Sequence, residues 1–326
     1  MSEPVRIGID IGGTFTDVAL EKGSARFTTK TLTTHTAPED GVLTGLKTVV
    51  EEANVAPSEV ALVIHGTTLA TNALIERKGA KTALLTTEGF RDVLQIRAED
   101  RFEQYDLTIE PPEPLVPRAL RLPVAERVDV SGAVRRTLDE AAVARAAEQM
   151  EAAGVEAVAV GFLHSYAAPA HEERAREILA KHLPGVAITL SGEVAPEMRE
   201  YERFSTAVAN AYVQPLMAGY LDRLEKRLAE AGVSSPLLLM LSSGGLTTVE
   251  TAKRFPVRLV ESGPAGGAAF AADIARRHGL DTVLSFDMGG TTAKLCLVDR
   301  ATPRTSRAFE VARVWRFRKG SGLPLR

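Results

Sequence analysis

The stretch Asp10-Ile11-Gly12-Gly13-Thr14-Phe15-Thr16-Asp17 places two adjacent glycines between an acidic residue and a hydroxyl residue. Ahead of it, Val5, Ile7, Ile9 and Ile11 alternate with other residues, which is the pattern of a half-buried strand. Because glycine has no Cβ, the backbone N–H groups of such a turn can approach a phosphate closely. A tight hairpin turn is the competing explanation, since paired glycines are common in hairpins.

A second copy of the pattern favours the phosphate site. Asp287-Met288-Gly289-Gly290-Thr291-Thr292-Ala293-Lys294 follows a predicted strand at 282–286 and precedes another at 295–298. Coincidental hairpins would not need an Asp at the same offset, so we interpret the two copies as parts of related lobes that face one ligand. A carboxylate beside a phosphate is repulsive unless a metal ion lies between them, so the two acidic residues point to Mg²⁺.

A third glycine-rich stretch has two explanations. Glu261-Ser262-Gly263-Pro264-Ala265-Gly266-Gly267 leads into a predicted Ala-rich helix at 268–277. The free N–H groups at a helix start attract anions. Close packing of the helix against a sheet accounts for the glycines equally well, and both explanations stay open.

Composition excludes several classes of protein. The 326 residues are 45% hydrophobic and 25% charged, with a net charge of -3, which suits a globular chain of two domains and not a general nucleic-acid binder. The sequence has no apolar run long enough to span a membrane and no signal-peptide core, so we expect no membrane contact. Its single cysteine, Cys296, indicates a reducing compartment, and we expect a cytoplasmic protein.

The order of the predicted elements favours an α/β fold with a mixed sheet, because an antiparallel meander opens the chain and strands then alternate with helices. We expect strands at 5–11, 15–20, 26–31, 60–64, 81–86, 155–162, 186–190 and 237–241. Helices are expected at 37–53, 69–78, 138–153, 169–182 and 196–231, the last broken near Pro215. Residues 99–127 are interpreted as a long loop or small insertion, and the basic tail from Ala301 as a solvated connector.

These segments together resemble the actin/Hsp70/sugar-kinase superfamily of ATPases, and more narrowly hydantoinase A, the ATP-binding part of N-methylhydantoinases and 5-oxoprolinases. The further blocks that carry the narrower resemblance are His65-Gly66-Thr67-Thr68-Leu69-Ala70-Thr71-Asn72, Glu88-Gly89-Phe90-Arg91-Asp92, Glu200-Tyr201-Glu202-Arg203 and Ser242-Ser243-Gly244-Gly245. The resemblance implies actin-like (ribonuclease H-like) lobes with mixed sheets. Residues 1–195 would form an N-terminal lobe, and 196–326 the start of a second. Members of this family are about twice as long, so we expect a truncated second lobe.

The resemblance also implies a function. Relatives use ATP to phosphorylate the oxygen of a cyclic amide, such as a hydantoin, 5-oxoproline or another lactam, so that water can attack the carbonyl. A hydantoinase B-type subunit usually completes the hydrolase. Two alternatives remain: the ATP-binding subunit of an acetone or acetophenone carboxylase, and an actin- or Hsp70-like nucleotide switch. The blocks around His65 and Glu200 favour the two enzymes over the switch.

Site residues follow from the resemblance position by position. Asp10 and Asp287 would act in catalysis by organising Mg²⁺ or its waters. ATP would be contacted by Gly12, Gly13, Thr14, Gly289, Gly290, Thr291, Thr292, Lys294, Gly263 and Gly266. Lys294 is explained equally well as a solvated strand lysine. His65 could lie at the substrate side of the site, although a hydrogen-bonded structural histidine is the commoner case. Arg91 and Asp92 call for the same caution, and we interpret Glu200 to Arg203 as a charged helix face.

Overall fold

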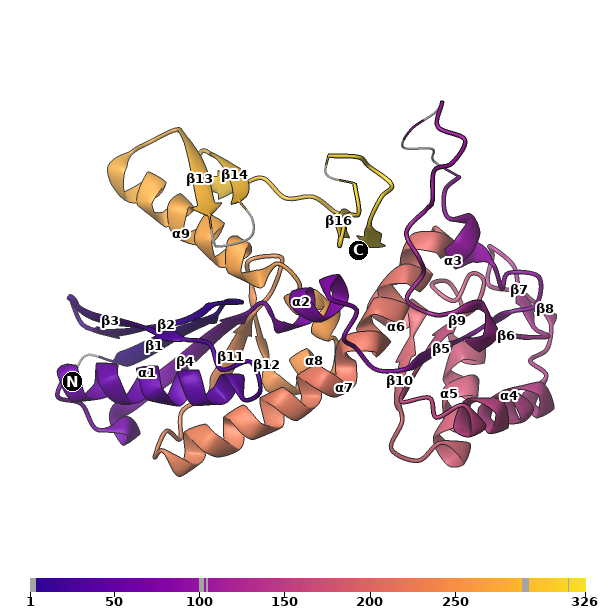
Figure 1. Cartoon of the computed structure of the whole chain (residues 1–326), viewed down its shortest axis with the longest axis horizontal. Helices are drawn as coiled ribbons and strands as arrows, with labels where there is room; N and C mark the ends of the chain where they lie inside the picture. The colour runs from indigo at the N-terminus through magenta and orange to yellow at the C-terminus, as the bar shows by residue number, and fades with distance from the viewer. Residues whose placement is uncertain (1–3, 100–102, 104, 289–292, 316) are drawn as a thin grey trace. The chain divides into compact units, whose positions relative to one another are not determined.

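The computed structural model describes residues 4–99, 103, 105–288, 293–315 and 317–326. They form two compact units, each assembled from separate stretches of the chain (Figure 1). Unit 1 consists of Met1–Asn72 and Met217–Ser306, and unit 2 consists of Ala73–Leu216 and Arg307–Arg326. The compact units therefore interleave along the chain, whereas the expected division at residue 195 follows chain order and remains a hypothesis about the family's lobes.

Unit 1 is built on a six-stranded mixed sheet with the strand order β12-β11-β4-β1-β2-β3. The strands are β1 (Val5–Ile11), β2 (Phe15–Lys22), β3 (Ala25–Leu32), β4 (Val60–Thr67), β11 (Leu237–Met240) and β12 (Leu246–Thr248). The first three form the predicted antiparallel meander, whereas β4 runs parallel to both β1 and β11. Along β1, buried and exposed residues alternate without exception, which confirms the pattern seen in the sequence.

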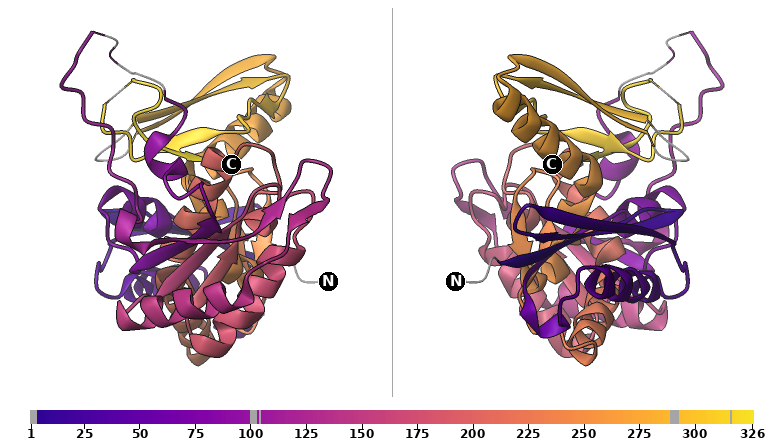
Figure 2. Two further views of the ribbon diagram at one scale, coloured as in Figure 1. Left: turned by 90° about the vertical axis from the view of Figure 1, so that its right-hand side faces the viewer. Right: turned by 90° about the vertical axis from the view of Figure 1, so that its left-hand side faces the viewer.

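Helices cover this sheet. The helices of unit 1 are α1 (Pro38–Glu52), the beginning of α2 (Leu69–Ile75), the end of α7 (Glu200–Glu230), α8 (Val249–Arg254) and α9 (Ser262–His278). Helix α1 packs against β2 and β3 (Figure 2). Its residues Val42, Leu46 and Val49 recur at helical spacing and are buried. Pro38 occupies the first turn of α1, where its missing N–H is least costly.

A smaller antiparallel sheet completes unit 1. Its strands are β13 (Thr282–Met288), β14 (Ala293–Asp299) and β15 (Thr302–Pro303). Helix α9 packs on one side of the β13–β14 hairpin (Figure 1). Leu284, Phe286, Met288 and Leu295 share the other face by strand alternation, and all four are exposed. The hairpin therefore presents an apolar face to solvent.

Unit 2 contains a four-stranded parallel sheet with the order β10-β9-β5-β6. Its strands are β5 (Thr82–Thr87), β6 (Arg121–Val124), β9 (Ala157–Gly161) and β10 (Ala187–Leu190), with a separate two-stranded ribbon, β7 (Arg127–Val128) and β8 (Val134–Arg136). Its helices are α3 (Val93–Ile96), α4 (Glu140–Ala152), α5 (Ala170–His182), α6 (Ser191–Val194) and the beginning of α7. Helices α4 and α5 pack together over the sheet (Figure 1) and bury Val143, Met150 and Leu179.

Two expectations about irregular regions were wrong. Residues 99–127 are not only a loop, because they include β6, whose four residues extend the parallel sheet beside β5. The tail is not a solvated connector: β16 (Phe309–Val311) pairs with β17 (Leu323–Leu325), and both Val311 and Leu325 are buried. Short strands whose partners are distant in sequence leave little periodic signal.

Pro215 does not break α7, which runs continuously from Glu200 to Glu230. The proline is exposed, whereas Val213 and Met217 on either side of it are fully buried. The free energy gained by burying the flanking side chains offsets the cost of the backbone hydrogen bond that a proline removes from a helix interior.

Candidate functional site

The first glycine turn connects β1 and β2. The Gly12 N–H donates to the Phe15 carbonyl at 2.9 Å and closes the hairpin. Gly13 and Thr14 are exposed, and a Cβ built on Gly13 would have Asn72 Nδ2 as its nearest neighbour, at an unstrained 3.7 Å. Neither a positive φ angle nor tight packing therefore requires glycine at position 13. The space beside it is available to a ligand.

Side chains from later segments brace this turn. Thr33 donates its hydroxyl to the Gly12 carbonyl at 3.0 Å, and Thr68 donates its hydroxyl to the Ile11 carbonyl at 3.1 Å. Asn72 in turn donates its side-chain amide to the Thr68 hydroxyl at 3.3 Å. Sequence reasoning assigned no role to Thr33, Thr68 or Asn72, although the block from His65 to Asn72 was a signal for two of them.

Asp10 is the last polar residue of β1 before the turn. It lies opposite Asp17 of β2 and Gly66 of β4 in the sheet register. A Cβ on Gly66 would come within 3.0 Å of Asp10 Oδ1, and one on Gly263 within 3.6 Å of the same oxygen. Two glycines from distant segments therefore make room for this carboxylate.

The third glycine-rich stretch differs from its expected structure. Helix α9 begins at Ser262 rather than at 268, so Gly263 and Gly266 lie inside the helix and not in a loop before it. Its first turn is fixed to the end of β4, because Ser262 Oγ donates to the Thr67 carbonyl at 3.2 Å. Gly266 faces Met240 of β11, which favours packing, whereas Gly263 faces the Asp10 carboxylate.

The second Asp-Gly-Gly-Thr copy is described only at its two ends. Gly289, Gly290, Thr291 and Thr292 lie outside the described residues, so the prediction that the two glycine turns face one ligand stays a prediction. Asp287 and Lys294 are cross-strand partners in the β13–β14 hairpin. Lys294 forms an ion pair with Glu261; the Lys294 side chain is 30% exposed and the Glu261 side chain 28%. Lys294 is therefore more enclosed than a fully solvated strand lysine.

Asp10 lies within electrostatic range of several of the site's charged residues. The pKa of Asp10 is raised, first because surrounding protein removes part of its hydration, then because the charges of Asp17 and Asp287 repel its own. Lys294 and Lys30 act in the opposite direction. Asp10 and Asp287, 277 positions apart in sequence, thus lie within electrostatic range of one another. A raised carboxylate pKa beside like charges is typical of a site that binds a cation.

A hydrated Mg²⁺ fits this arrangement better than a tightly caged ion. In the portion of the chain that the structure describes, no three His, Cys, Asp or Glu side chains converge on one metal position. Mg²⁺ usually keeps several waters and is held by one or two carboxylates together with substrate phosphates. Asp10 and Asp287 can supply those two carboxylates.

His65 has a structural role in unit 1. It is fully buried within β4, and its Nε2 forms a 2.8 Å hydrogen bond with the Tyr220 hydroxyl. Burial lowers the pKa of His65 to about 4, so the imidazole is neutral at physiological pH. The structural role that the sequence left open is the one that the structure supports.

Two charged motifs of unit 2 also have structural roles. Asp92 accepts two hydrogen bonds from Arg118 at 2.9 Å, and Arg91 donates to the Arg118 carbonyl. The expected charged helix face at Glu200 to Arg203 was wrong, because Arg203 is fully buried. Its guanidinium donates to the carbonyls of Phe162 and Glu197 and to the Ser191 hydroxyl. Helical spacing alone could not show that this part of α7 enters the core.

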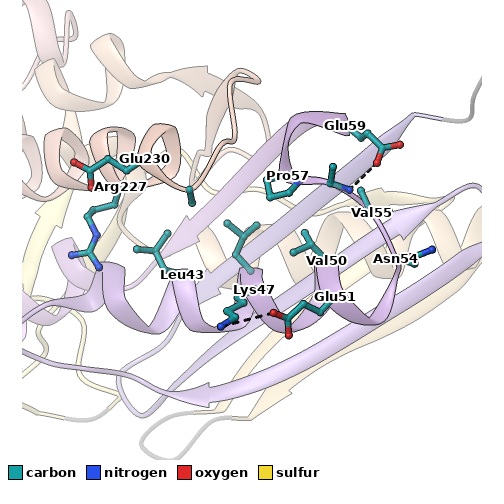
Figure 3. Close-up of a pocket in the computed structure, with 13 residues that line it drawn as sticks. Leu43, Lys47, Val50, Glu51, Asn54, Val55, Pro57, Glu59, Arg227 and Glu230 are labelled. Carbon is teal, nitrogen blue, oxygen red and sulfur yellow. Dashed lines mark hydrogen bonds and ion pairs between the residues drawn. The ribbon is translucent and has the colours of Figure 1, made fainter.

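A large open groove lies elsewhere on unit 1. It encloses about 940 Å³ between α1 and the end of α7, with Leu43, Leu46 and Val50 among its lining residues (Figure 3). Charged side chains on its rim are paired, as in the ion pair of Lys47 with Glu51. None of the predicted site residues lines it. The groove is therefore separate from the candidate site.

Two family models match most of the chain. A family model described as the hydantoinase/oxoprolinase N-terminal region matches residues 6–183, and one described as hydantoinase/oxoprolinase matches residues 203–320. Across the described residues, no helix is long and apolar enough to cross a membrane.

Individual relatives cover most of this chain. The caprolactamase subunit alpha of Pseudomonas jessenii is 37% identical over 90% of the chain and 43% of its own length. The acetophenone carboxylase gamma subunit of Aromatoleum aromaticum is 32% identical over 91% of the chain and 43% of its own length. The crystal structure of the ATP-dependent caprolactamase from Pseudomonas jessenii matches 90% of the chain with a TM-score of 0.83 and 36% identity. The chain thus spans less than half the length of these relatives.

Proposed function

Because the chain belongs to the hydantoinase/oxoprolinase family, we propose that it is the ATP-binding portion of an enzyme that opens a cyclic amide at the expense of ATP. The observation that carries the proposal is the meeting of Asp10, Asp287, Lys294 and Gly263 next to the exposed turn at Gly13. An acidic pair beside a lysine and an unobstructed glycine turn is suited to a metal-bound polyphosphate.

Each part of the site has a distinct role in this proposal. The backbone N–H groups of Gly13 and Thr14 would contact phosphate oxygens, whereas Gly12, whose own N–H closes the hairpin, would shape the turn. Asp10 and Asp287 would hold Mg²⁺ through its waters. Lys294 neutralises phosphate charge, and Gly263 lets a ligand approach the start of α9. Equivalent contacts are assigned from the sequence alone to the residues of the second turn that lie outside the described residues: Gly289, Gly290, Thr291 and Thr292.

ATP supplies a phosphoryl group that converts the amide oxygen into a leaving group. An amide carbonyl is otherwise a poor electrophile, so this activation lowers the barrier to attack by water. A hydantoinase B-type partner is proposed to supply the lactam site. Relatives that are named as alpha and gamma subunits support a partner of this general kind.

Calorimetric titration of the chain with ATP, with and without Mg²⁺, tests the proposal. Asp10→Asn and Asp287→Asn should each weaken Mg²⁺-dependent binding by at least about tenfold, or about 1.4 kcal/mol, because an amide is a weaker Mg²⁺ ligand than a carboxylate. Asp281→Asn is the matched control, since this residue is exposed and precedes β13 at the end opposite Asp287. Parental binding by both site variants would rule out these roles.

A ketone carboxylase is the second candidate, supported by the 32% identity to the acetophenone carboxylase subunit. Phosphoryl transfer from ATP is common to both candidates, but the accepting molecule differs. In the assembled enzyme, ATP turnover stimulated by a lactam without bicarbonate favours the hydrolase. Turnover that requires both a ketone and bicarbonate favours the carboxylase.

A further inference from the structure

Glu261 has an unusual backbone conformation directly before α9. Its φ of 66° and ψ of 24° lie in the left-handed region of backbone conformation, which residues other than glycine rarely adopt. Its N–H donates to Thr71 Oγ1 at 3.2 Å, and its neighbours Val260 and Ser262 are buried. Packing on both sides therefore enforces the strained conformation. Strain of this kind is concentrated at functional sites.

The carboxylate of Glu261 holds Lys294. The two side chains form an ion pair, although Lys294 also lies near Asp10 and opposite Asp287. A lysine side chain has a flexible stem, so the partner that it contacts decides where its ammonium group lies. The partner here is the residue with the strained backbone.

This pairing keeps the basic groups near Asp10 engaged with other carboxylates. Lys294 pairs with Glu261, and Lys30 pairs with Asp17 at 3.0 Å. An ammonium group has three donors, so Lys294 can contact Glu261 and still offer a donor to a phosphate oxygen. Asp10 and Asp287 then keep their oxygens for a metal ion.

We propose that Glu261 is a positioning residue that holds the Lys294 ammonium beside the phosphate site and away from the Asp10 and Asp287 carboxylates. The inference rests on the proposed function, because it assumes that metal-bound phosphate occupies this site. Without the Glu261 charge, Lys294 moves to Asp10 or Asp287 and competes with Mg²⁺.

Three variants of Glu261 separate this role from a structural one. Glu261→Gln keeps the size of the side chain but removes its charge, and should weaken Mg²⁺-ATP binding about tenfold. Glu261→Asp keeps the charge and should restore part of the affinity. Glu261→Gly relieves the backbone strain, so its melting temperature without nucleotide should rise by a few degrees while binding weakens. A purely structural residue would instead lose stability and binding together.

A double-mutant cycle with Lys294→Met shows whether Glu261 acts through the lysine. Lys294→Met alone should weaken binding, and adding Glu261→Gln should weaken it no further. Calorimetry with Mg²⁺-ATP gives the dissociation constants, and thermal melting without nucleotide gives the second readout.

The outcomes distinguish the two proposals. If the parent chain binds Mg²⁺-ATP and Glu261→Gln binds equally well, the positioning role is overturned and the proposed function stands. Fully additive losses in the cycle would also overturn it, because Glu261 would then act independently of Lys294. If the parent shows no Mg²⁺-dependent nucleotide binding, the proposed function fails and this inference fails with it.

Discussion

The exposed apolar face of the β13–β14 hairpin predicts that the purified 326-residue chain associates. Leu284, Phe286, Met288 and Leu295 are 60%, 59%, 69% and 64% exposed, and they lie next to one another on one sheet face. Contiguous apolar surface of this kind marks a contact surface or promotes aggregation. The strand β13 is also the edge of its sheet, where unpaired backbone groups can template further pairing.

The magnitude follows from these exposures. Complete burial of a side chain of this size contributes about 1.5–3 kcal/mol, so covering the exposed part contributes about 1–2 kcal/mol for each residue. Replacing Leu284 and Phe286 together by serine should therefore remove about 2–4 kcal/mol from the association free energy of each face. That loss weakens association by roughly 30- to 900-fold.

Sedimentation velocity over a wide range of protein concentrations measures the effect. The parent chain should associate, and the variant with Leu284→Ser and Phe286→Ser should remain monomeric at concentrations where the parent does not. Val130→Ser is a control, because Val130 is 68% exposed and belongs to unit 2, whereas the hairpin belongs to unit 1. The reasoning would be refuted by a parent chain that stays monomeric and melts cooperatively over the same concentration range.

Further predictions concern the site and the cores of the two units. Gly66→Ala should weaken Mg²⁺-dependent ATP binding several-fold while the fold persists, because the new Cβ would lie 3.0 Å from Asp10 Oδ1. Gly267→Ala is the control and should bind as the parent does in the same titration, because its new Cβ would meet no atom within 4 Å. The pKa of His65 is about 4 in the folded chain and 6.5 in the unfolded chain, so the unfolded state binds a proton first as the pH falls. The free energy of unfolding should therefore fall by about 3 kcal/mol as the pH drops from 6.5 to 4. Urea unfolding at several pH values should show this loss in the parent and a shallower one in His65→Gln; equal slopes would contradict it. Arg203→Met should cost about 3–5 kcal/mol in urea unfolding, because it leaves buried carbonyls without their donor, and a loss below about 1 kcal/mol would show that the network is dispensable.

The sequence by itself determined those features whose signal is local. The alternation from Val5 to Ile11 and the adjacent glycines predicted the β1–β2 hairpin, which the structure confirms. The repeated Asp-Gly-Gly-Thr pattern predicted the β13–β14 hairpin around its second copy. Both features are local because a strand's periodicity and a turn's glycines are fixed by residues that are neighbours along the chain.

Only the tertiary structure decided which distant residues meet. That Gly66 and Gly263 both make room for the Asp10 carboxylate, and that Glu261 holds Lys294, depends on segments that are far apart in sequence. Burial likewise changed the meaning of charged and polar residues, since Arg203 and His65 look like surface or site residues in sequence but lie in the cores of their units. No local pattern encodes these contacts, because the energy of burying a charge or imidazole depends on the partners that the fold brings to it.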